Sequence, residues 1–389
     1  MKKLAIVTSH PIQYYAPWFR YLANIGCLSI KVFYLWDFGV KQQVDEGFGQ
    51  AFQWDIPLLN GYEYEFVTNV SPNPGTHHFW GLQNPSLISQ VRAYNPDAVL
   101  LMSYNYASIY RLLWNWNTHN IPLLFRGDSH RLLPIKGIKA FVRRQFITQI
   151  YRYFAACLYV GKANYEYFQY HGVSKNNLFF SPHAIDNDRF STQARTAKQQ
   201  AITWKQELGI RQDHAVILFA GKFEETKRPI DLLQAFLQAK LDNVSLLFVG
   251  AGILEDDLKS QAAGQENIYF APFQNQSLMP RTYAIADLVV LPSYGETWGL
   301  VINEAMCLAR PVIVSNHVGC SQDLVHPGKN GLIFSAGDVS ALADSLQAAF
   351  SDRKSLQQWG ETSRRIISKY TYMEATQGLT QAIDHILKK

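Results

Sequence analysis

The sequence predicts an α/β protein with two domains, each built on a doubly wound parallel sheet, and a cleft between them. The chain has 389 residues, which is more than one hydrophobic core normally serves. Hydrophobic residues make up 48% of it, so both halves can bury a core. Short apolar runs alternate with helical apolar stripes in two series, and this alternation is the pattern of repeated βαβ units.

The first series begins near the N-terminus. Residues 4–8 form a short apolar run that is typical of a buried parallel strand. After a loop, apolar side chains recur at i, i+3, i+4 and i+7 and predict a helix that ends near Gly26: Trp18, Tyr21, Leu22 and Ile25. Residues 29–35 predict the next strand, and the apolar runs 98–102 and 122–125 continue the series.

The second series follows a polar, charged stretch, residues 186–201, which we interpret as the boundary between the domains. It contains one predicted helix, 230–239, and five predicted strands: 215–220, 245–250, 267–270, 287–291 and 311–314. We therefore assign residues 1–190 to the first domain and residues 191–370 to the second. The last predicted helix lies within residues 371–389 and could reach back to the first domain.

The composition argues against several classes of function. The formal net charge of +5 is mild for this length, and without an Arg-rich run it predicts no nucleic-acid partner. None of the four cysteines forms a CxxC pair, so we expect no zinc site and interpret them as reduced, buried thiols of a cytoplasmic protein. The start, MKKLAIVTSHP, is too short in apolar residues for a signal peptide, and no apolar run approaches the roughly eighteen residues of a membrane span.

The first of three informative loops in the second domain is FAGKFEETKRP. It is expected at the carboxyl end of a strand, where open α/β sheets bind ligands. Lys222 and Lys227 lie near Gly221, and two ammonium groups beside a helix start suit a diphosphate. The alternative is a solvated loop in which the lysines pair with Glu224 and Glu225, and this loop taken alone favours that alternative.

The second loop, VGAGILE, carries Gly250 and Gly252. Glycines at these positions allow either a close approach of the backbone to a ligand or an ordinary tight turn, and the sequence leaves both interpretations open. The motif does not extend to GxGxxG, so a nicotinamide cofactor is not predicted.

The third loop opens the stretch LPSYGETWGLVINEAM, residues 291–306. If a helix begins near Trp298, its first amides are free donors and carry about half a positive charge, and Gly299 leaves room for a phosphate. Glu304, one to two turns inside, could accept hydrogen bonds from ribose hydroxyls, and Glu296 could hold the hydroxyls of a second sugar. These groups together describe a nucleotide-sugar site. The alternative is a capping acid and an exposed helix glutamate.

With these motifs the sequence resembles the retaining glycosyltransferases of family 4, which have the GT-B fold. The resemblance covers the second half strongly and the first half weakly, and it rests on four segments: FAGKFEETKRP, LLFVGAG, YAIADLVVLPSYGETWGLVINEAMCLARPVIVSNHVG and LVHPGKNGLIF. It implies that Lys222 and Lys227 bind the donor diphosphate and that Glu296 holds the donor sugar. It implies donor contacts at six further positions: Gly221, Gly250, Trp298, Gly299, Leu300 and Glu304.

Two positions in the second half depart from the family pattern. Lys222 stands where the family usually has arginine, which keeps the charge but loses the bidentate fork of a guanidinium. Arg228 stands where the family commonly has glycine after the companion lysine.

The first half supplies candidate acceptor or cleft residues. The family often has a Gly-Gly loop after its first strand; here the loop is SHPIQYYAP, in which His10, Gln13 and Tyr14 either line the cleft or fill a turn. The segment LLFRGDSHRL stands where the family has its catalytic-region histidine, and it contributes three candidates: Arg126, Asp128 and His130. The segment SPHAIDNDRF, residues 181–190, is interpreted as a structural link between the domains.

Residues 131–152 are basic, with six cations and no acid: Arg131, Lys136, Lys139, Arg143, Arg144 and Arg152. Four apolar residues fall among them: Phe141, Phe146, Ile147 and Ile150. An amphipathic basic helix can lie on an anionic membrane, and several members of the family it resembles act on lipid-linked acceptors. The preferred interpretation is a solvated helix with its apolar face in the core; the alternative is peripheral contact at the inner face of a membrane.

The whole sequence predicts an enzyme that transfers a hexosyl group from a UDP- or GDP-sugar to an acceptor hydroxyl and retains the anomeric configuration. We expect Lys222, Lys227 and the helix amides to stabilise the departing diphosphate, with neither a metal ion nor a cofactor. Three alternatives stay open: a nucleotide-sugar epimerase of the same fold, a sugar phosphorylase and a non-catalytic sugar-nucleotide-binding protein. The sequence determines neither the sugar, nor the base, nor the acceptor.

Overall fold

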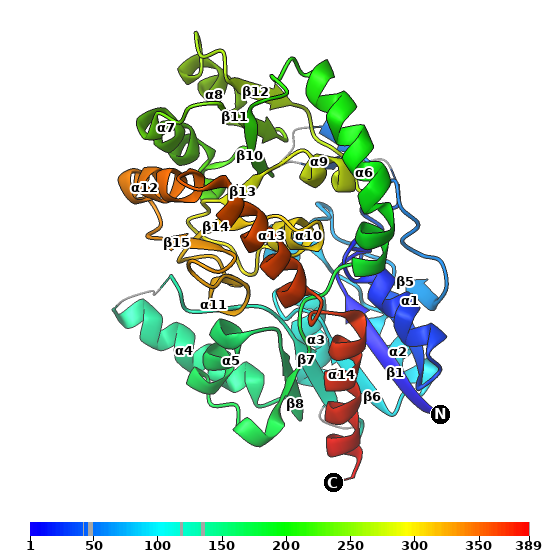
Figure 1. Ribbon diagram of the computed structural model, residues 1–389. Coiled ribbons are helices and arrows are strands. Elements are labelled where there is room, and N and C mark those ends of the chain that lie inside the picture. The colour runs from blue at the N-terminus through cyan, green and yellow to red at the C-terminus, as the bar shows by residue number, and fades with distance from the viewer. Residues whose placement is uncertain (42, 46–49, 117–119, 134–136, 389) are drawn as a thin grey trace. The chain divides into compact units, whose positions relative to one another are not determined.

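The protein is seen in a computed structural model that describes residues 1–41, 43–45, 50–116, 120–133 and 137–388 (Figure 1). The chain divides into two compact units. Unit 1 contains three segments: Met1–Gln43, Phe52–Ala184 and Tyr372–Lys389. Unit 2 contains two: Val44–Ala51 and Ile185–Thr371. The C-terminal segment thus belongs to the same unit as the N-terminus.

Unit 1 contains a seven-stranded parallel sheet, as judged from the described part of the chain. In spatial order its strands are β5 (Glu63–Phe66), β2 (Leu28–Tyr34), β1 (Lys2–Thr8), β6 (Ala98–Leu101), β7 (Leu123–Arg126), β8 (Ala156–Tyr159) and β9 (Leu178–Phe180). The order reverses between β1 and β6, which is the switch point of a doubly wound sheet.

Unit 2 contains a six-stranded sheet, again parallel in every described pair. Its spatial order is β12 (Ile268–Ala271), β11 (Val244–Val249), β10 (Ala215–Ala220), β13 (Leu288–Leu291), β14 (Val312–Ser315) and β15 (Gly331–Phe334). The switch point lies between β10 and β13. The two parallel sheets confirm the predicted α/β class. Two short strands, β3 (Gln43–Asp45) and β4 (Gln50–Phe52), form a separate pair.

The central strands are apolar throughout because helices cover both faces of each sheet. Every residue of β10, with the sequence AVILFA, is buried, and so is every residue of β11. Removing each large apolar side chain from water contributes about 1.5–3 kcal/mol before the entropy of ordering is counted. This continuous burial explains why short apolar runs located these strands to within a residue or two.

The helices of unit 1 form a layer on each face of its sheet. On one face, α1 (Ala16–Asn24) and α14 (Tyr372–Leu387) share a core with the strands. The other core contains residues of four helices: α2 (Leu87–Tyr94), α3 (Ala107–Trp116), α4 (Ile138–Tyr151) and α5 (Lys162–Tyr170). A buried hydrogen bond of 3.0 Å from Trp18 Nε1 to Thr376 Oγ1 ties α14 to α1. The last helix is therefore an integral part of unit 1.

Unit 2 has seven described α-helices besides the four-residue helix α11 (Ser321–Leu324). They are α6 (Asn187–Glu207), α7 (Pro229–Ala239), α8 (Glu255–Gln261), α9 (Met279–Ala284), α10 (Leu300–Cys307), α12 (Val339–Phe350) and α13 (Arg353–Ile367). Helices α7, α8 and α12 share one core with the sheet. Helix α6 packs on α9 and α10. The loops that contain Lys222 and Glu296 follow the carboxyl ends of β10 and β13.

The polar stretch 186–201, the predicted domain boundary, forms most of helix α6, which buries Phe190 and Trp204 and exposes its polar face. Two expectations about local structure need correction. Ile25 lies beyond the end of α1 and is 43% exposed, so it is not part of the buried stripe. Three cysteines are buried as expected, but Cys27 is exposed.

No helix within the described residues has the length and hydropathy that a bilayer span requires.

Candidate functional site

Two loops of unit 2 are joined at the carboxyl edge of its sheet. The loop after β10 contains the short 3₁₀ helix η3 (Glu225–Lys227), and the loop after β13 leads to α10. The amide of Tyr294 donates to the carbonyl of Thr226 at 2.8 Å, which links the two loops directly. Because β10 and β13 flank the switch point, these loops lie where ligands bind in open α/β sheets.

An ion pair between Lys227 and Glu296 forms the second link between the loops. Both side chains are partly buried, at 23% and 18% exposure. The solvated-loop alternative is therefore wrong for Lys227, whose carboxylate partner is Glu296. Glu224 instead accepts a hydrogen bond of 2.8 Å from Thr226 Oγ1. Lys222 lies partly buried in the same loop. The structure thus brings together Lys227, which is predicted to bind the donor diphosphate, and Glu296, which is predicted to hold the donor sugar.

Helix α10 begins at Leu300, two residues later than the predicted start near Trp298. Gly299 is its N-cap, with φ of +96°, a left-handed conformation that favours glycine. A Cβ at this position would lie 2.9 Å from Leu291 and 3.0 Å from Val318. The free amides of the first turn therefore belong to residues beyond Gly299, and Ile302 already donates to the Gly299 carbonyl at 2.9 Å.

Trp298 and Glu304 are both buried, at 2% and 1% exposure. The Trp298 indole donates to Asn303 Oδ1 at 2.9 Å, which fixes the ring beside the helix start. Glu304 Oε2 accepts a hydrogen bond of 2.6 Å from the hydroxyl of Tyr283. Because Glu304 is buried, it is not the exposed helix glutamate of the alternative interpretation. A buried carboxylate needs hydrogen-bond donors, and the Tyr283 hydroxyl is one of them. The contact of Glu304 with a ribose stays a prediction.

The segment 318–320 supports the Glu296 loop, and the sequence reasoning gave it no function. Gly319 N donates to the Glu296 carbonyl at 2.9 Å, and Cys320 N donates to the Trp298 carbonyl at 2.9 Å. These bonds hold the backbone on both sides of Thr297. They position the Glu296 side chain for its contact with Lys227.

Gly221 and Gly250 lie where two neighbouring loops approach each other. A Cβ on Gly250 would stand 2.0 Å from the Gly221 carbonyl oxygen, so the approach itself requires glycine. This contact explains Gly250 without a ligand, and donor binding at Gly221 and Gly250 stays a prediction. Arg228 has φ of +54°, which explains why glycine suits this position in the family. Its guanidinium donates to Asp231 at 2.9 Å.

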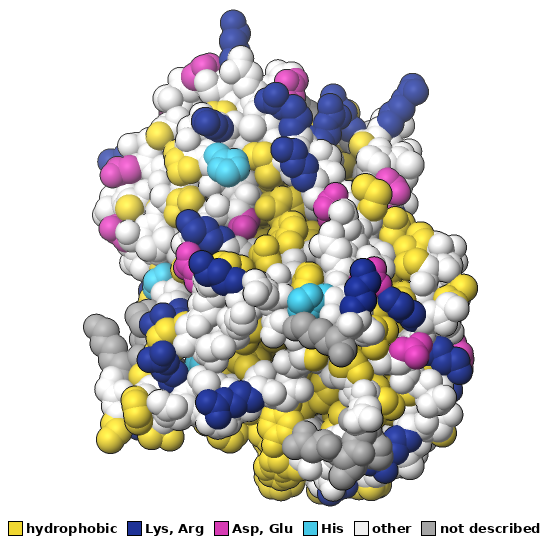
Figure 2. All heavy atoms as spheres, turned by 90° about the horizontal axis from the view of Figure 1, so that it is seen from below, with side chains coloured by type: hydrophobic (Ala, Val, Ile, Leu, Met, Phe, Trp, Pro, Cys, Tyr) yellow, Lys and Arg dark blue, Asp and Glu magenta, His cyan; other side chains and the backbone are white. Residues whose placement is uncertain are grey.

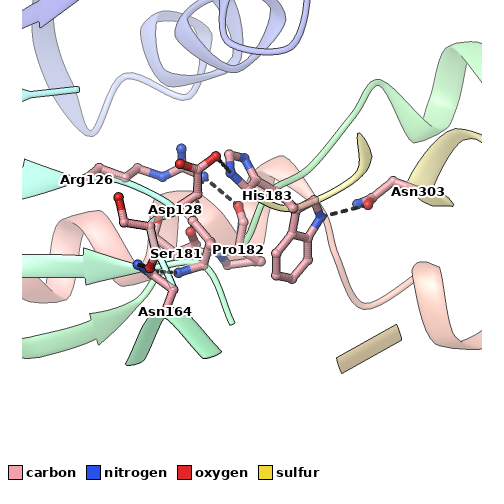
Figure 3. Close-up of polar contacts among 10 residues, drawn as sticks. Arg126, Asp128, Asn164, Ser181, Pro182, His183 and Asn303 are labelled. Atoms are coloured by element: carbon pink, nitrogen blue, oxygen red, sulfur yellow. Dashed lines mark hydrogen bonds and ion pairs between the residues drawn. The ribbon is translucent and has the colours of Figure 1, made fainter. Parts of the chain in front are cut away.

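A second cluster lies in unit 1 at the carboxyl end of β7 (Figure 3). Arg126 is 2% exposed and donates from Nη2 to the carbonyls of Ser181 and Pro182, at 3.2 and 2.9 Å. Its guanidinium carbon lies 5.5 Å from the centre of the Tyr15 ring. Nε and Nη1 have no hydrogen-bond partner among the described residues. Burial lowers the pKa of Arg126, opposed mainly by the field of Tyr15.

His183 joins this cluster, so the segment 181–190 is more than the structural link that the sequence predicts. Its Nε2 donates to Asp128 Oδ2 at 3.3 Å, and its ring stacks on Tyr15 with centroids 6.1 Å apart. Burial lowers the pKa of His183, and the hydrogen bond to Asp128 opposes the shift. The only signal in the sequence was a histidine shortly after a strand, which is too common to identify a site.

The other four candidates of unit 1 have contacts of their own. His10 is hydrogen bonded to Ser9 at 3.0 Å and packs edge-on against Trp36 and Phe38. Gln13 and Tyr14 are partly buried in the turn before α1. His130 Nδ1 accepts from the Leu132 amide at 3.2 Å, within its own loop. Of the six candidates, Arg126 and Asp128 lie in the cluster that contains His183.

Comparison with known sequences finds a family match for part of unit 2. Residues 200–366, all within unit 2, match the family Glycosyl transferases group 1. The chain is 26% identical over 212 residues to the sulfoquinovosyl transferase SQD2 of Arabidopsis thaliana, which covers 52% of this chain and 39% of that protein. It is 25% identical over 224 residues to a D-inositol 3-phosphate glycosyltransferase of Nocardia farcinica, covering 54% and 48%. The match spans less than half the length of either relative.

Solved structures with the same fold cover nearly the whole chain. The Anabaena protein Alr3699/HepE, solved in complex with UDP and glucose, has a TM-score of 0.76 and 17% identity over 99% of this chain and 100% of its own. The sucrose-phosphate synthase of Thermosynechococcus elongatus has a TM-score of 0.70 and 18% identity over 98% of each chain. Residues 200–366 thus match the group 1 glycosyltransferases, family 4, and the chain has the GT-B-like fold.

Proposed function

We propose that the chain is a retaining glycosyltransferase that moves a hexosyl group from a UDP- or GDP-sugar to an acceptor hydroxyl without a metal ion. The observation that carries the proposal is the Lys227–Glu296 pair, which joins two loops beside the start of α10. Two structures of one structural neighbour support a uridine donor, because Alr3699/HepE was solved with UDP and glucose and with UDP-glucose. The proposal assigns the donor to unit 2 and the acceptor to unit 1.

The donor's leaving group sets the demands on unit 2. As the bond from the anomeric carbon to the diphosphate oxygen breaks, negative charge builds on the diphosphate. Lys222, Lys227 and the free amides at the start of α10 are the cationic and polar groups available to stabilise it. Removing one such preorganised donor typically lowers the turnover rate by about a hundred- to a thousandfold. The Glu296 carboxylate holds Lys227 in place.

Retention of configuration follows if the acceptor attacks the face from which the diphosphate departs. The acceptor oxygen then bonds to the anomeric carbon, and its proton passes to an oxygen of the departing phosphate. This step balances without an enzymic nucleophile. Glu296 would accept hydrogen bonds from the hydroxyls of the sugar and so orient the anomeric carbon.

We assign the acceptor side to the Asp128–His183 pair. Asp128 has a side chain that is 32% exposed, whereas His183 is nearly fully buried. The Asp128 carboxylate is therefore accessible to an acceptor hydroxyl, and the hydrogen bond from the buried His183 fixes its orientation. Arg126 fixes the carbonyls of Ser181 and Pro182 that precede His183. It acts as a positioning residue and not as a direct contact.

The test of the proposed function is product analysis after a donor screen. Thermal unfolding with a panel of UDP- and GDP-sugars identifies the donor, since a ligand at about a hundred times its Kd adds about 2.7 kcal/mol of stability. NMR of the product then reports the anomeric configuration. Transfer with retained configuration supports the proposal. Conversion of the donor into another nucleotide-sugar without an acceptor would identify an epimerase. Activity that depends on inorganic phosphate would identify a phosphorylase, and tight donor binding without turnover would identify a binding protein.

We also propose that helix α4 contacts the cytoplasmic face of an anionic membrane. The expectation that the apolar face of this segment lies in the core is only half right, since Ile147 and Ile150 are buried. Four apolar side chains of α4 are largely exposed: Ile138 80%, Phe141 61%, Val142 61% and Phe146 53%. They recur at i, i+3, i+4 and i+8 and therefore share one side of the helix.

The aromatic surface continues from α4 onto α3. The rings of Phe146 and Tyr110 stack with centroids 6.0 Å apart, and Tyr110 contacts Trp114 at 5.8 Å. Trp114 is 67% exposed. Exposed aromatic rings beside Lys139 and Arg143 have the chemistry of a membrane interface, where each cation near an anionic surface contributes about 1 kcal/mol. In Figure 2, Lys and Arg side chains lie beside hydrophobic ones near the left edge, on the side where α4 and α5 lie in Figure 1.

A further inference from the structure

A small cavity lies between α4 and α5 in unit 1, separate from both clusters described above. Its volume is about 70 Å³, several times the roughly 10–15 Å³ that one water needs. The side chains that matter are Arg131, Arg143 and Arg144 from the α4 region, and Tyr170 and His171 from the end of α5. No acid is among the described residues that line the cavity, and the sequence has none between Asp128 and Glu166.

Two of the guanidinium groups meet on a single aromatic ring. The guanidinium carbon of Arg131 lies 3.5 Å from the centre of the Tyr170 ring, and that of Arg144 lies 4.3 Å from it. Cation–π contacts stabilise each arginine by about 0.5–1 kcal/mol at a partly exposed site, but they leave the N–H donors unused. Within the described chain, neither arginine has an ion pair. The ring therefore holds two like charges together with nothing negative between them.

His171 adds a buried polar atom to the same cavity. The residue is 4% exposed, and its Nδ1 has no hydrogen-bond partner within the described residues. A buried ring nitrogen without a partner carries a desolvation cost that a protein normally avoids. Burial, with the fields of Arg144, Arg131 and Arg143, lowers the pKa of His171 to about 4, so the ring is neutral near pH 7. The three arginines and His171, whose Nδ1 has no described partner, thus line the same cavity.

We propose that this cavity binds a phosphate group through Arg131, Arg143 and Arg144, beside the ring of His171. Guanidinium groups bind phosphate oxygens in a bidentate manner, and a phosphate would neutralise the cations held on Tyr170. The phosphate has two sources, a lipid headgroup or a soluble phosphate ester. The inference is independent of the donor site, because the residues involved are all in unit 1.

The first experiment measures inorganic phosphate binding by isothermal titration calorimetry. All proteins carry Lys222→Gln and Lys227→Gln, so that the proposed donor site does not contribute. Replacing Arg131 and Arg144 by glutamine is expected to weaken phosphate binding at least tenfold. The control is Arg152→Gln with Lys175→Gln, which removes the same charge from exposed positions outside the cavity. It should change the affinity less than twofold. The unfolding temperature of each variant verifies its fold.

A second readout follows His171 directly. Phosphate should shift the NMR signals of its ring in the parent and the control, but not in the Arg131→Gln, Arg144→Gln protein. Equal phosphate affinity in the two double variants, or no phosphate binding in the parent, overturns the site. Because the donor lysines are absent throughout, this result does not depend on the proposed glycosyl transfer.

Vesicle sedimentation then distinguishes the two sources of phosphate. Vesicles contain phosphatidylcholine with or without about 30% phosphatidylglycerol. If the source is a headgroup, the partition coefficient for the anionic vesicles should be at least tenfold lower for the Arg131→Gln, Arg144→Gln protein than for the control. Phe141→Ser with Val142→Ser should then abolish vesicle binding and leave the affinity for free phosphate unchanged. Equal partitioning of cavity variant and control, with weaker phosphate binding in the cavity variant, supports a soluble phosphate ester.

Discussion

Replacing Lys227 by alanine should lower the rate of glycosyl transfer far more than it lowers stability. The side chain is paired with Glu296, and both members of the pair are partly exposed, at 23% and 18%. Pairs of this kind contribute about 1 kcal/mol or less to folding. For a domain of this size, that change corresponds to a shift in unfolding temperature of about 2–4 °C.

The expected effect on turnover is larger because the charge on the diphosphate develops during the reaction. A lost cation at that position raises the barrier by about 2.7–4 kcal/mol, which is a hundred- to thousandfold in kcat. The change should appear in kcat more than in KM, since the interaction strengthens as the bond to the leaving group breaks.

The assay is initial-rate transfer with the donor found in the screen, alongside thermal unfolding of each variant. The matched control is Lys259→Ala, because Lys259 also pairs with a glutamate, Glu255, at 2.6 Å but lies on the exposed surface of α8. The control should keep its turnover and its unfolding temperature. A Lys227→Ala enzyme with kcat within threefold of the parent would refute the reasoning, as would a loss of activity explained by unfolding.

Three further predictions concern buried groups. Glu304→Gln should weaken donor binding at least tenfold in calorimetry with little change in unfolding temperature, because the amide oxygen can still accept from Tyr283; unchanged affinity would remove Glu304 from the donor site. Arg126→Met should lower the free energy of unfolding in urea by about 3 kcal/mol and leave donor affinity unchanged, because two buried carbonyls lose a charged donor. His171 has a pKa of about 4 when folded and about 6.5 when unfolded. The unfolded state therefore gains a proton first, and stability falls by up to about 3 kcal/mol as pH drops from 6.5 to 4. His171→Gln should flatten that part of the pH–stability curve, and an unchanged slope would contradict the assignment.

The parallel sheets could be predicted from the sequence because their strands are apolar on both faces. Runs such as AVILFA at 215–220 have no exposed face, so burial alone identifies them. Helix α6 was not recognised, since its buried positions are few and widely spaced among polar residues: Phe190, Ala197, Ala201 and Trp204. Strands β8 and β9 were not recognised because their apolar runs lie among neighbouring segments that are also rich in aromatic residues.

The sequence could single out the loops of the proposed donor site because they combine glycine, acid and base after recognisable strands; donor binding by these loops stays a prediction. The exact partners could not be predicted. The pairing of Lys227 with Glu296 depends on loops that are 69 residues apart in sequence. The burial of Glu304 depends on Tyr283, which lies on a different helix. His183 illustrates the same limit, because only the folded chain places it beside Asp128.

The central claim is that a nucleoside diphosphate binds at the start of α10 between Lys222 and Lys227. A structure of the chain in complex with UDP or GDP tests this most directly. The account predicts the diphosphate within hydrogen-bond distance of the first free amides of α10 and of both lysine ammonium groups. A diphosphate bound elsewhere, with Lys227 still paired to Glu296 and the start of α10 unoccupied, would contradict it.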